Sequence, residues 1–171
     1  MTLKNAAAGL PHGGGKSVIY ADPKLPAADK EKLIRSFACA IREMTEYIPG
    51  PDMGTDERCM AWIKDEIGRA VGLPPEIGGI PLDEIGATGF GLSVCVDIAR
   101  KFCALEIRGA RVVIQGFGSV GKHAARFLAA QGALIVAAAD SRGTLFDTKG
   151  IDVSQLIQLK NAGRSVLEYP T

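Results

Sequence analysis

A run of β-branched residues leads directly into a glycine-rich turn and then into a helix, and this order restricts the fold more than any other feature. Residues 111–115 read RVVIQ, a run typical of a buried parallel strand. The turn is a GxGxxG motif made by Gly116, Gly118 and Gly121. Residues 119–130 have helical periodicity, and LIVAAAD at residues 134–140 predicts a second strand. The sequence therefore predicts a βαβ unit with parallel strands, the start of a doubly wound α/β domain.

A glycine motif between a strand and a helix is typical of a dinucleotide-binding turn. The first glycine permits the tight turn, the second lets the backbone approach a pyrophosphate, and the third lets helix and strand pack closely. The helix N-terminus offers unpaired amides to the phosphates. The alternative is a turn with a purely structural role. The strand before it and the helix after it favour the dinucleotide-binding interpretation. The candidate cofactor-binding residues of this turn are Gly116, Phe117, Gly118, Ser119, Val120 and Gly121.

At the end of the second predicted strand, Asp140 and Ser141 occupy the position where a carboxylate commonly hydrogen-bonds the adenine ribose. Asp140 follows Gly121 by 19 residues, which is close to the spacing of that motif. A carboxylate at this position repels a 2′-phosphate and therefore favours NAD. Arg142 lies two residues further on and would attract that phosphate, so NADP stays open.

The first half of the chain has a different organisation, with short apolar pieces separated by glycine and proline. Apolar spacing predicts helices at residues 29–47, capped by Asp29, and at residues 56–71. Glycine and proline dominate residues 72–82, which we expect to form an irregular connection. A strongly apolar helix is predicted next, at residues 89–105.

Two charged residues lie in glycine-rich loops of this first half. Lys16 follows three glycines in LPHGGGKS, where we expect its ammonium to be partly desolvated. Asp52 lies in PGPDMGT soon after an apolar residue, which predicts the carboxyl end of a strand, where open α/β sheets bind ligands. A solvated lysine and a structural carboxylate are the alternatives for each residue taken alone.

The GGGKS segment is close to a phosphate-binding loop but differs from it by one residue. The GxxxxGK[ST] pattern requires glycine at position 10, where this chain has Leu10, and Gly9 comes one residue too early. Such a loop needs a fixed number of backbone amides around the phosphates. Nucleotide triphosphate chemistry is therefore the weaker alternative for this segment.

Composition argues against several other classes of protein. Hydrophobic residues at 47% and charged residues at 23% are typical of a soluble globular chain. A net charge of +1, without a long run of either sign, argues against nucleic acid and anionic membrane as partners. No stretch reaches the roughly 18 apolar residues that span a bilayer, and the four cysteines contain no CxxC pair. We expect a reduced, cytoplasmic location, no metal site, and a surface position for His123.

Taken together, these segments resemble the glutamate/leucine/phenylalanine/valine dehydrogenase family. The resemblance rests on MTLKNAAAGLPHGGGKSVIYADP, PGPDMGTDERCMAWIKDE, GATGFG and GFGSVG, which follow one another in the family's order. It implies a partial α/β substrate domain at residues 1–80 and a partial Rossmann NAD(P)-binding domain at residues 81–171. Family members are typically two to three times as long, so the resemblance also implies a partial chain.

The resemblance further implies a role for each motif. In the family, a lysine at the position of Lys4 holds the substrate α-carboxylate, and one at the position of Lys16 polarises the carbonyl or activates the attacking water. Asp52 matches the family's proton-transfer aspartate, and Thr88 matches a threonine near the nicotinamide amide. The glycine turn and Asp140 match the dinucleotide site. The implied reaction is the reversible NAD(P)-dependent oxidative deamination of an L-amino acid to a 2-oxo acid and ammonium.

Two substrate classes fit this resemblance. KNAAAG and GGGKSVI look like the branched-chain members, whereas PGPDMGT, MAWIKDE and ADSRG look like the glutamate members, which we favour slightly. The family also implies a homo-oligomer. The alternative function is a non-catalytic dinucleotide-binding module, which would bind NADH without turnover.

Overall fold

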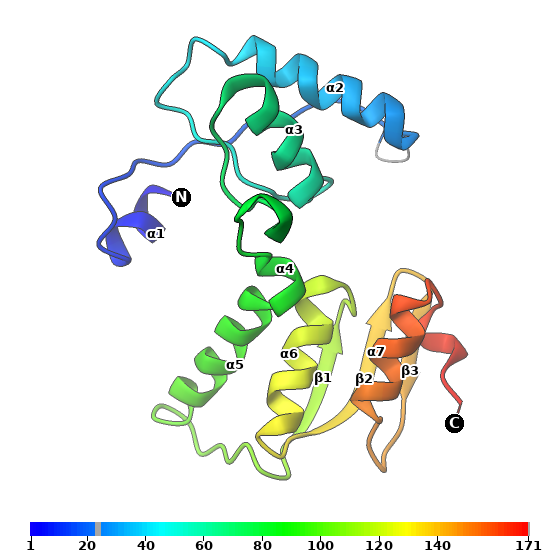
Figure 1. The fold of residues 1–171 in the computed structure, drawn as a ribbon. Helices are drawn as coiled ribbons and strands as arrows, with labels where there is room; N and C mark the ends of the chain where they lie inside the picture. The colour runs from blue at the N-terminus through cyan, green and yellow to red at the C-terminus, as the bar shows by residue number, and fades with distance from the viewer. Residues whose placement is uncertain (23–24, 171) are drawn as a thin grey trace. The chain divides into compact units, whose positions relative to one another are not determined.

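The computed structural model describes residues 1–22 and 25–170, and the chain divides into two compact units (Figure 1). The N-terminal unit comprises Met1–Pro81 and the C-terminal unit comprises Leu82–Thr171. Within the two described ranges, no helix combines the length and the apolar character that a membrane crossing requires.

The N-terminal unit is built around two helices that pack against each other. Its helical segments are α1 (Thr2–Ala7), α2 (Ala27–Ala40), α3 (Glu57–Ile67) and the short 3-10 turn η1 (Pro75–Ile77). The core between α2 and α3 is formed by Ile34, Ala38, Cys59, Met60 and Ile63. Neither residues 1–22 nor residues 25–81 contain a strand, so the prediction that Asp52 ends one is wrong. The residues before Asp52 lie beside residues 69–72, but the backbone hydrogen bond from the Val71 amide to the Pro49 carbonyl does not extend into a ladder.

The ends of these helices differ from the predicted ones for local reasons. Helix α2 starts at Ala27 with Pro26 as its N-cap, so Asp29 lies inside the first turn and does not cap the helix. The same helix ends at Ala40, well before residue 47. Helix α3 ends at Ile67 because Gly68, with a φ of 75°, adopts the left-handed conformation that terminates helices.

The C-terminal unit contains the predicted βαβ unit. Its strands are β1 (Arg111–Gln115), β2 (Leu134–Asp140) and β3 (Gly143–Phe146), and its helical segments are α4 (Leu82–Ile85), α5 (Ala87–Ala99), α6 (Ser119–Ala130), α7 (Val153–Asn161) and η2 (Val166–Glu168). Strands β1 and β2 are parallel, and α6 connects them, with all three bounds as predicted. Strand β3 was not predicted; it pairs antiparallel with β2 after a two-residue turn.

Helices α6 and α7 lie side by side, and α6 covers β1 and β2 (Figure 1). Apolar side chains of the strands and of these helices form one core, which includes Ile114, Phe117, Leu128, Ile135, Leu145, Leu156 and Val166. The glycine turn starts at the end of β1, at the edge of this core. Close packing of the core beside it fixes the conformation of the turn.

Helix α5 packs closely against α6 through two glycines. A Cβ on Gly89 would lie 2.6 Å from the backbone nitrogen of Ala124, and one on Gly86 would overlap the ring of His123. His123 is consequently 7% exposed, so the prediction of a surface position is wrong. Burial lowers the pKa of this histidine, and the nearby Arg126 and Lys122 add to the effect, because each disfavours the charged imidazolium.

Candidate functional site

An ion pair joins the two glycine-loop residues singled out from the sequence. The Lys16 ammonium donates to the Asp52 carboxylate, although 36 positions separate them in the chain. The side chains are 64% and 55% exposed. The expected partial burial of Lys16 is therefore not found, and the pair faces solvent.

The Asp52 carboxylate has a fixed orientation. Its Oδ1 accepts a hydrogen bond from the Met53 amide at 2.8 Å, which leaves Oδ2 for Lys16. The Thr55 hydroxyl accepts from the Asp52 amide and donates to the Asp52 carbonyl, both at 2.9 Å. These local hydrogen bonds hold the loop in a compact turn, from which the Asp52 side chain points toward Lys16.

Lys16 and Asp52 both line a cavity of about 390 Å³ in the N-terminal unit. Most of the other lining residues are apolar and include Leu33, Phe37, Met60 and Ile63. A cavity lined by a cation, a carboxylate and many apolar groups is suited to a small amphipathic molecule.

Two other residues of this region lie apart from the pair. Lys4 is exposed on α1 and is not among the residues that line the cavity. The GGGKS segment has no regular secondary structure and does not lead directly into a helix, as a phosphate-binding loop must. The nucleotide triphosphate alternative is therefore wrong.

The glycine turn of the C-terminal unit brings two of its glycines into contact and is open at the third. Gly116 has a φ of 85°, which only glycine adopts without strain. A Cβ on Gly121 would overlap the Gly116 carbonyl oxygen, so helix and turn are in direct contact. A Cβ on Gly118 would meet no atom within 4 Å, which leaves open space over the turn. The first amides of α6 have no side-chain cap, as in helix N-termini that bind a pyrophosphate.

The other predicted residues around this turn take different positions. Ser119 and Val120 are exposed in the first turn of α6. The Phe117 side chain is 1% exposed in the core, so only its backbone faces the turn. Thr88 is exposed in the first turn of α5, next to the glycine that packs against α6. Thr88 therefore lies in the first turn of α5, which packs against α6, the helix that follows the glycine motif.

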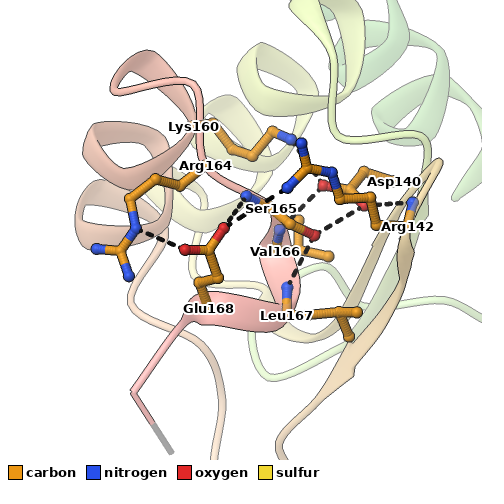
Figure 2. A network of polar contacts seen from close by, with 8 residues as sticks. All are labelled: Asp140, Arg142, Lys160, Arg164, Ser165, Val166, Leu167 and Glu168. Atoms are coloured by element: carbon orange, nitrogen blue, oxygen red, sulfur yellow. Dashed lines mark hydrogen bonds and ion pairs between the residues drawn. The ribbon is translucent and has the colours of Figure 1, made fainter.

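Asp140 is the centre of a polar network at the end of β2 (Figure 2). Its Oδ1 accepts from the Arg142 amide at 2.9 Å and the Ser165 hydroxyl at 3.1 Å. Its Oδ2 accepts from the Lys160 ammonium at 2.7 Å and the Val166 amide at 2.9 Å. Lys160 and these other donors hold the pKa of the Asp140 carboxyl well below its usual range.

This network affects the predicted role of Asp140. A carboxylate offers about four acceptor positions, and four donors of the chain already use them. Ribose hydroxyls would have to replace one of these donors. Ser141 and Arg142 are exposed in the turn that follows. The prediction of ribose binding by Asp140 stays a prediction.

Sequence reasoning did not identify the partners in this network. Lys160 comes from α7, and Ser165 and Val166 come from the segment that starts η2. No local pattern links them to Asp140, because the contact depends on how the end of the chain folds back onto β2. The one available signal was SVLE, a capping box in which Glu168 accepts from the Ser165 amide at 2.8 Å.

Family comparisons match both parts of the chain. Residues 1–69 match the model for the Glu/Leu/Phe/Val dehydrogenase dimerisation domain, and residues 78–171 match that for glutamate/leucine/phenylalanine/valine dehydrogenase. The chain is 35% identical to a cryptic catabolic NAD-specific glutamate dehydrogenase of Bacillus subtilis, over 95% of this chain and 41% of the relative. It is 38% identical to an NADP(+)-dependent glutamate dehydrogenase of Pyrobaculum calidifontis, over 93% of this chain and 41% of the relative.

A solved structure agrees with these matches. The hetero-hexameric glutamate dehydrogenase from Thermus thermophilus, in its Leu-bound form, has a TM-score of 0.83 at 34% identity. The similarity covers 96% of this chain and 43% of that one. The predicted α/β fold class, a partial N-terminal domain followed by the start of a dinucleotide-binding domain, is confirmed. The chain spans less than half the length of the relatives it matches.

Two glycine substitutions separate the folding role of the turn from its binding role. We expect Gly121→Ala to destabilise the C-terminal unit by about 1–3 kcal/mol, because the added methyl group overlaps the Gly116 carbonyl. Gly118→Ala should fold normally but weaken NADH binding about tenfold or more, because its methyl group occupies the space over the turn. Thermal unfolding and NADH titration measure both effects. A fully stable Gly121→Ala variant would contradict the packing described for this turn.

Removing the charge of Asp140 should destabilise the same unit in a pH-dependent way. Asp140→Asn loses the ion pair with Lys160, and we expect a loss of about 2 kcal/mol at pH 7. Because the folded-state pKa is lowered, the stabilisation is present above the unfolded pKa of about 4 and is lost as pH falls through the folded value. Wild type and variant should therefore converge in strong acid. Denaturant unfolding measured from pH 7 to pH 2 would contradict this if the difference stayed constant.

Proposed function

Because the chain belongs to the glutamate/leucine/phenylalanine/valine dehydrogenase family, we propose that it carries catalytic and cofactor-binding residues of an NAD(P)-dependent amino-acid dehydrogenase. The reaction is the reversible oxidative deamination of an L-amino acid to a 2-oxo acid and ammonium. The observation that supports it most directly is the Lys16–Asp52 pair on an amphipathic cavity. The dinucleotide turn in the same chain supports it independently.

Glutamate is the proposed substrate. The Bacillus and Pyrobaculum relatives and the Thermus structure are all named glutamate dehydrogenases. The cavity offers Lys16 as a cation for a carboxylate or a carbonyl oxygen. Leucine, valine and phenylalanine are the alternatives, and activity toward a panel of 2-oxo acids distinguishes them.

Lys16 acts at the substrate carbon that carries the carbonyl or iminium group. Its ammonium donates a hydrogen bond to the substrate carbonyl oxygen in the amination direction, which makes the carbonyl carbon more electrophilic. In the deamination direction the same group orients the water that attacks the iminium carbon. The glycines before Lys16 leave the loop free of side chains that would block this approach.

Asp52 moves the proton of the amine. Its carboxylate accepts a proton from the substrate ammonium before oxidation and returns it when the amine forms. The turn at Thr55 holds the carboxylate in one orientation, so little reorganisation is needed at each transfer. Lys4 is proposed to hold the substrate α-carboxylate, as the family resemblance implies.

The cofactor is proposed to bind at the glycine turn. Gly116, Gly118 and the first amides of α6 would hold its pyrophosphate, and Thr88 would contact its nicotinamide end. When bound, the nicotinamide exchanges a hydride with the substrate Cα. Relatives named as NAD-specific and NADP-dependent both match this chain, so NAD is proposed with NADP as an alternative. Binding affinities for NADH and NADPH, measured side by side, decide between them.

Assembly and location are proposed on separate grounds. A homo-oligomer is proposed, since one matched model describes a dimerisation domain and the Thermus structure is described as hetero-hexameric. The four cysteines are free thiols, which supports a reducing, cytoplasmic location. The alternative function is a dinucleotide-binding module without turnover, which the glycine turn taken alone would support. NADH binding without activity toward any 2-oxo acid would select it.

Substitution of either member of the pair should abolish turnover and leave cofactor binding unchanged. We expect Lys16→Ala and Asp52→Asn to lower kcat at least about 100-fold, because each removes an acid or base group. Lys32→Ala, which removes an exposed lysine from α2, is the matched control and should keep full activity. NADH oxidation with ammonium and 2-oxoglutarate gives the rate, and NADH fluorescence gives the binding. Wild-type turnover by Lys16→Ala would refute its catalytic role.

A further inference from the structure

The segment that carries Asp52 is supported by a second segment directly after α3. The Val71 amide donates to the Pro49 carbonyl at 2.9 Å, and a Cβ on Gly50 would lie 3.1 Å from the Val71 side chain. Gly72, with a φ of 69°, lies so close to Pro51 that an added Cβ would overlap the proline ring. Residues 69–72 therefore run alongside residues 47–51, which lead into Asp52.

Arg69 makes the strongest contacts in this arrangement. Its Nε donates to the Tyr47 carbonyl at 3.0 Å. Its Nη2 donates to the carbonyls of Ile41 at 2.7 Å, Arg42 at 3.1 Å and Met44 at 3.0 Å. One half-buried guanidinium thus binds four backbone carbonyls, and these carbonyls lie in the turn between the end of α2 and the Asp52 segment. Charged donors make stronger hydrogen bonds than neutral ones, so the turn is tightly held.

The direction of Arg69 follows from the residue before it. Gly68 ends α3 in the left-handed conformation and turns the chain back toward the end of α2. Tyr47, whose carbonyl Arg69 binds, also lies beside the Lys16 loop, since a Cβ on Gly15 would be 3.5 Å from its ring and both Tyr47 and Lys16 line the cavity. The turn that Arg69 holds therefore lies next to both loops of the ion pair.

We propose that Arg69 is a positioning residue for the Lys16–Asp52 pair, acting through the backbone of residues 41–51. This inference rests on the proposed function for its catalytic meaning, but its structural part can be measured without turnover. Arg69 contacts none of the proposed reacting groups. It fixes the turn from which Asp52 extends, and its loss should free that turn while α2 and α3 keep their common core.

Hydrogen exchange of three amides provides the direct test. The amides of Asp52, Met53 and Thr55 are all hydrogen-bonded within the loop, so their exchange reports its opening. In Arg69→Met we expect their exchange to rise about tenfold or more. Arg69→Lys should give an intermediate rise, because a lysine keeps the charge but cannot bind carbonyls on two sides.

Arg35→Met is the matched control. Arg35 also makes several ionic contacts in this unit, but they go to Glu31, Asp65 and Glu66 in α2 and α3 and not to residues 41–51. We expect exchange at the three loop amides to remain within about twofold of wild type in this variant. An equal rise in Arg35→Met and Arg69→Met would overturn the proposal, because the effect would then reflect general destabilisation.

The effect of Arg69 on catalysis is measured separately from hydrogen exchange. In the active protein, Arg69→Met should lower kcat about tenfold or more and leave the KM for NAD(P)H unchanged, whereas Arg35→Met should change neither. If Arg69→Met does not fold, Arg69→Lys decides: faster loop exchange supports the proposal, and wild-type exchange overturns it. Absence of turnover in the wild type would refute the proposed function but not the exchange result.

Discussion

The proposed chemistry depends on one contact, the ion pair between the Lys16 ammonium and the Asp52 carboxylate. Both side chains are more than half exposed, and ion pairs of this kind contribute little to stability because water competes for both charges. The pair therefore cannot hold its own loops in place. The loops are held by other contacts: the Thr55 turn, the Arg69 contacts and the close approach of Gly72 to Pro51. The two charged groups are thus brought together by the backbone, which leaves them available to a ligand.

The C-terminal unit is organised around a different constraint, the contact of Gly121 with the Gly116 carbonyl. This contact lets α6 begin directly above the end of β1, while Phe117 anchors the turn in the core. The Asp140 network fixes the far end of β2 by tying it to α7 and η2. Both oxygens of the Asp140 carboxylate accept hydrogen bonds within the chain, so this end of β2 is held in place without a ligand. If Asp140 binds ribose as predicted, one of these donors, such as Lys160, has to be displaced.

The sequence predicted the parts whose structure is determined locally. The bounds of β1, α6 and β2 follow from β-branched residues, a glycine motif and helical periodicity, all within 30 residues. The ion pair joins Lys16 and Asp52, two loop residues that the sequence had already indicated as candidates. The end of α2 could not be predicted, because Arg69, nearly 30 residues away, holds the carbonyls of the turn at 41–44. The same holds for His123, whose burial depends on Gly86 and Gly89 at the start of α5, and for the partners of Asp140.

Zero-length cross-linking tests the central contact most directly. A water-soluble carbodiimide joins an amine to a carboxylate only when the two are in contact, so it reports the pair in solution without any ligand. The account predicts an amide bond between Lys16 and Asp52, identified by mass spectrometry of the digested protein. The exposed Lys32–Asp29 pair provides an internal standard, because its two groups are 3.2 Å apart and both are accessible to the reagent. Formation of the Lys32–Asp29 link, with Asp52 unlinked or joined to another lysine, would contradict the account.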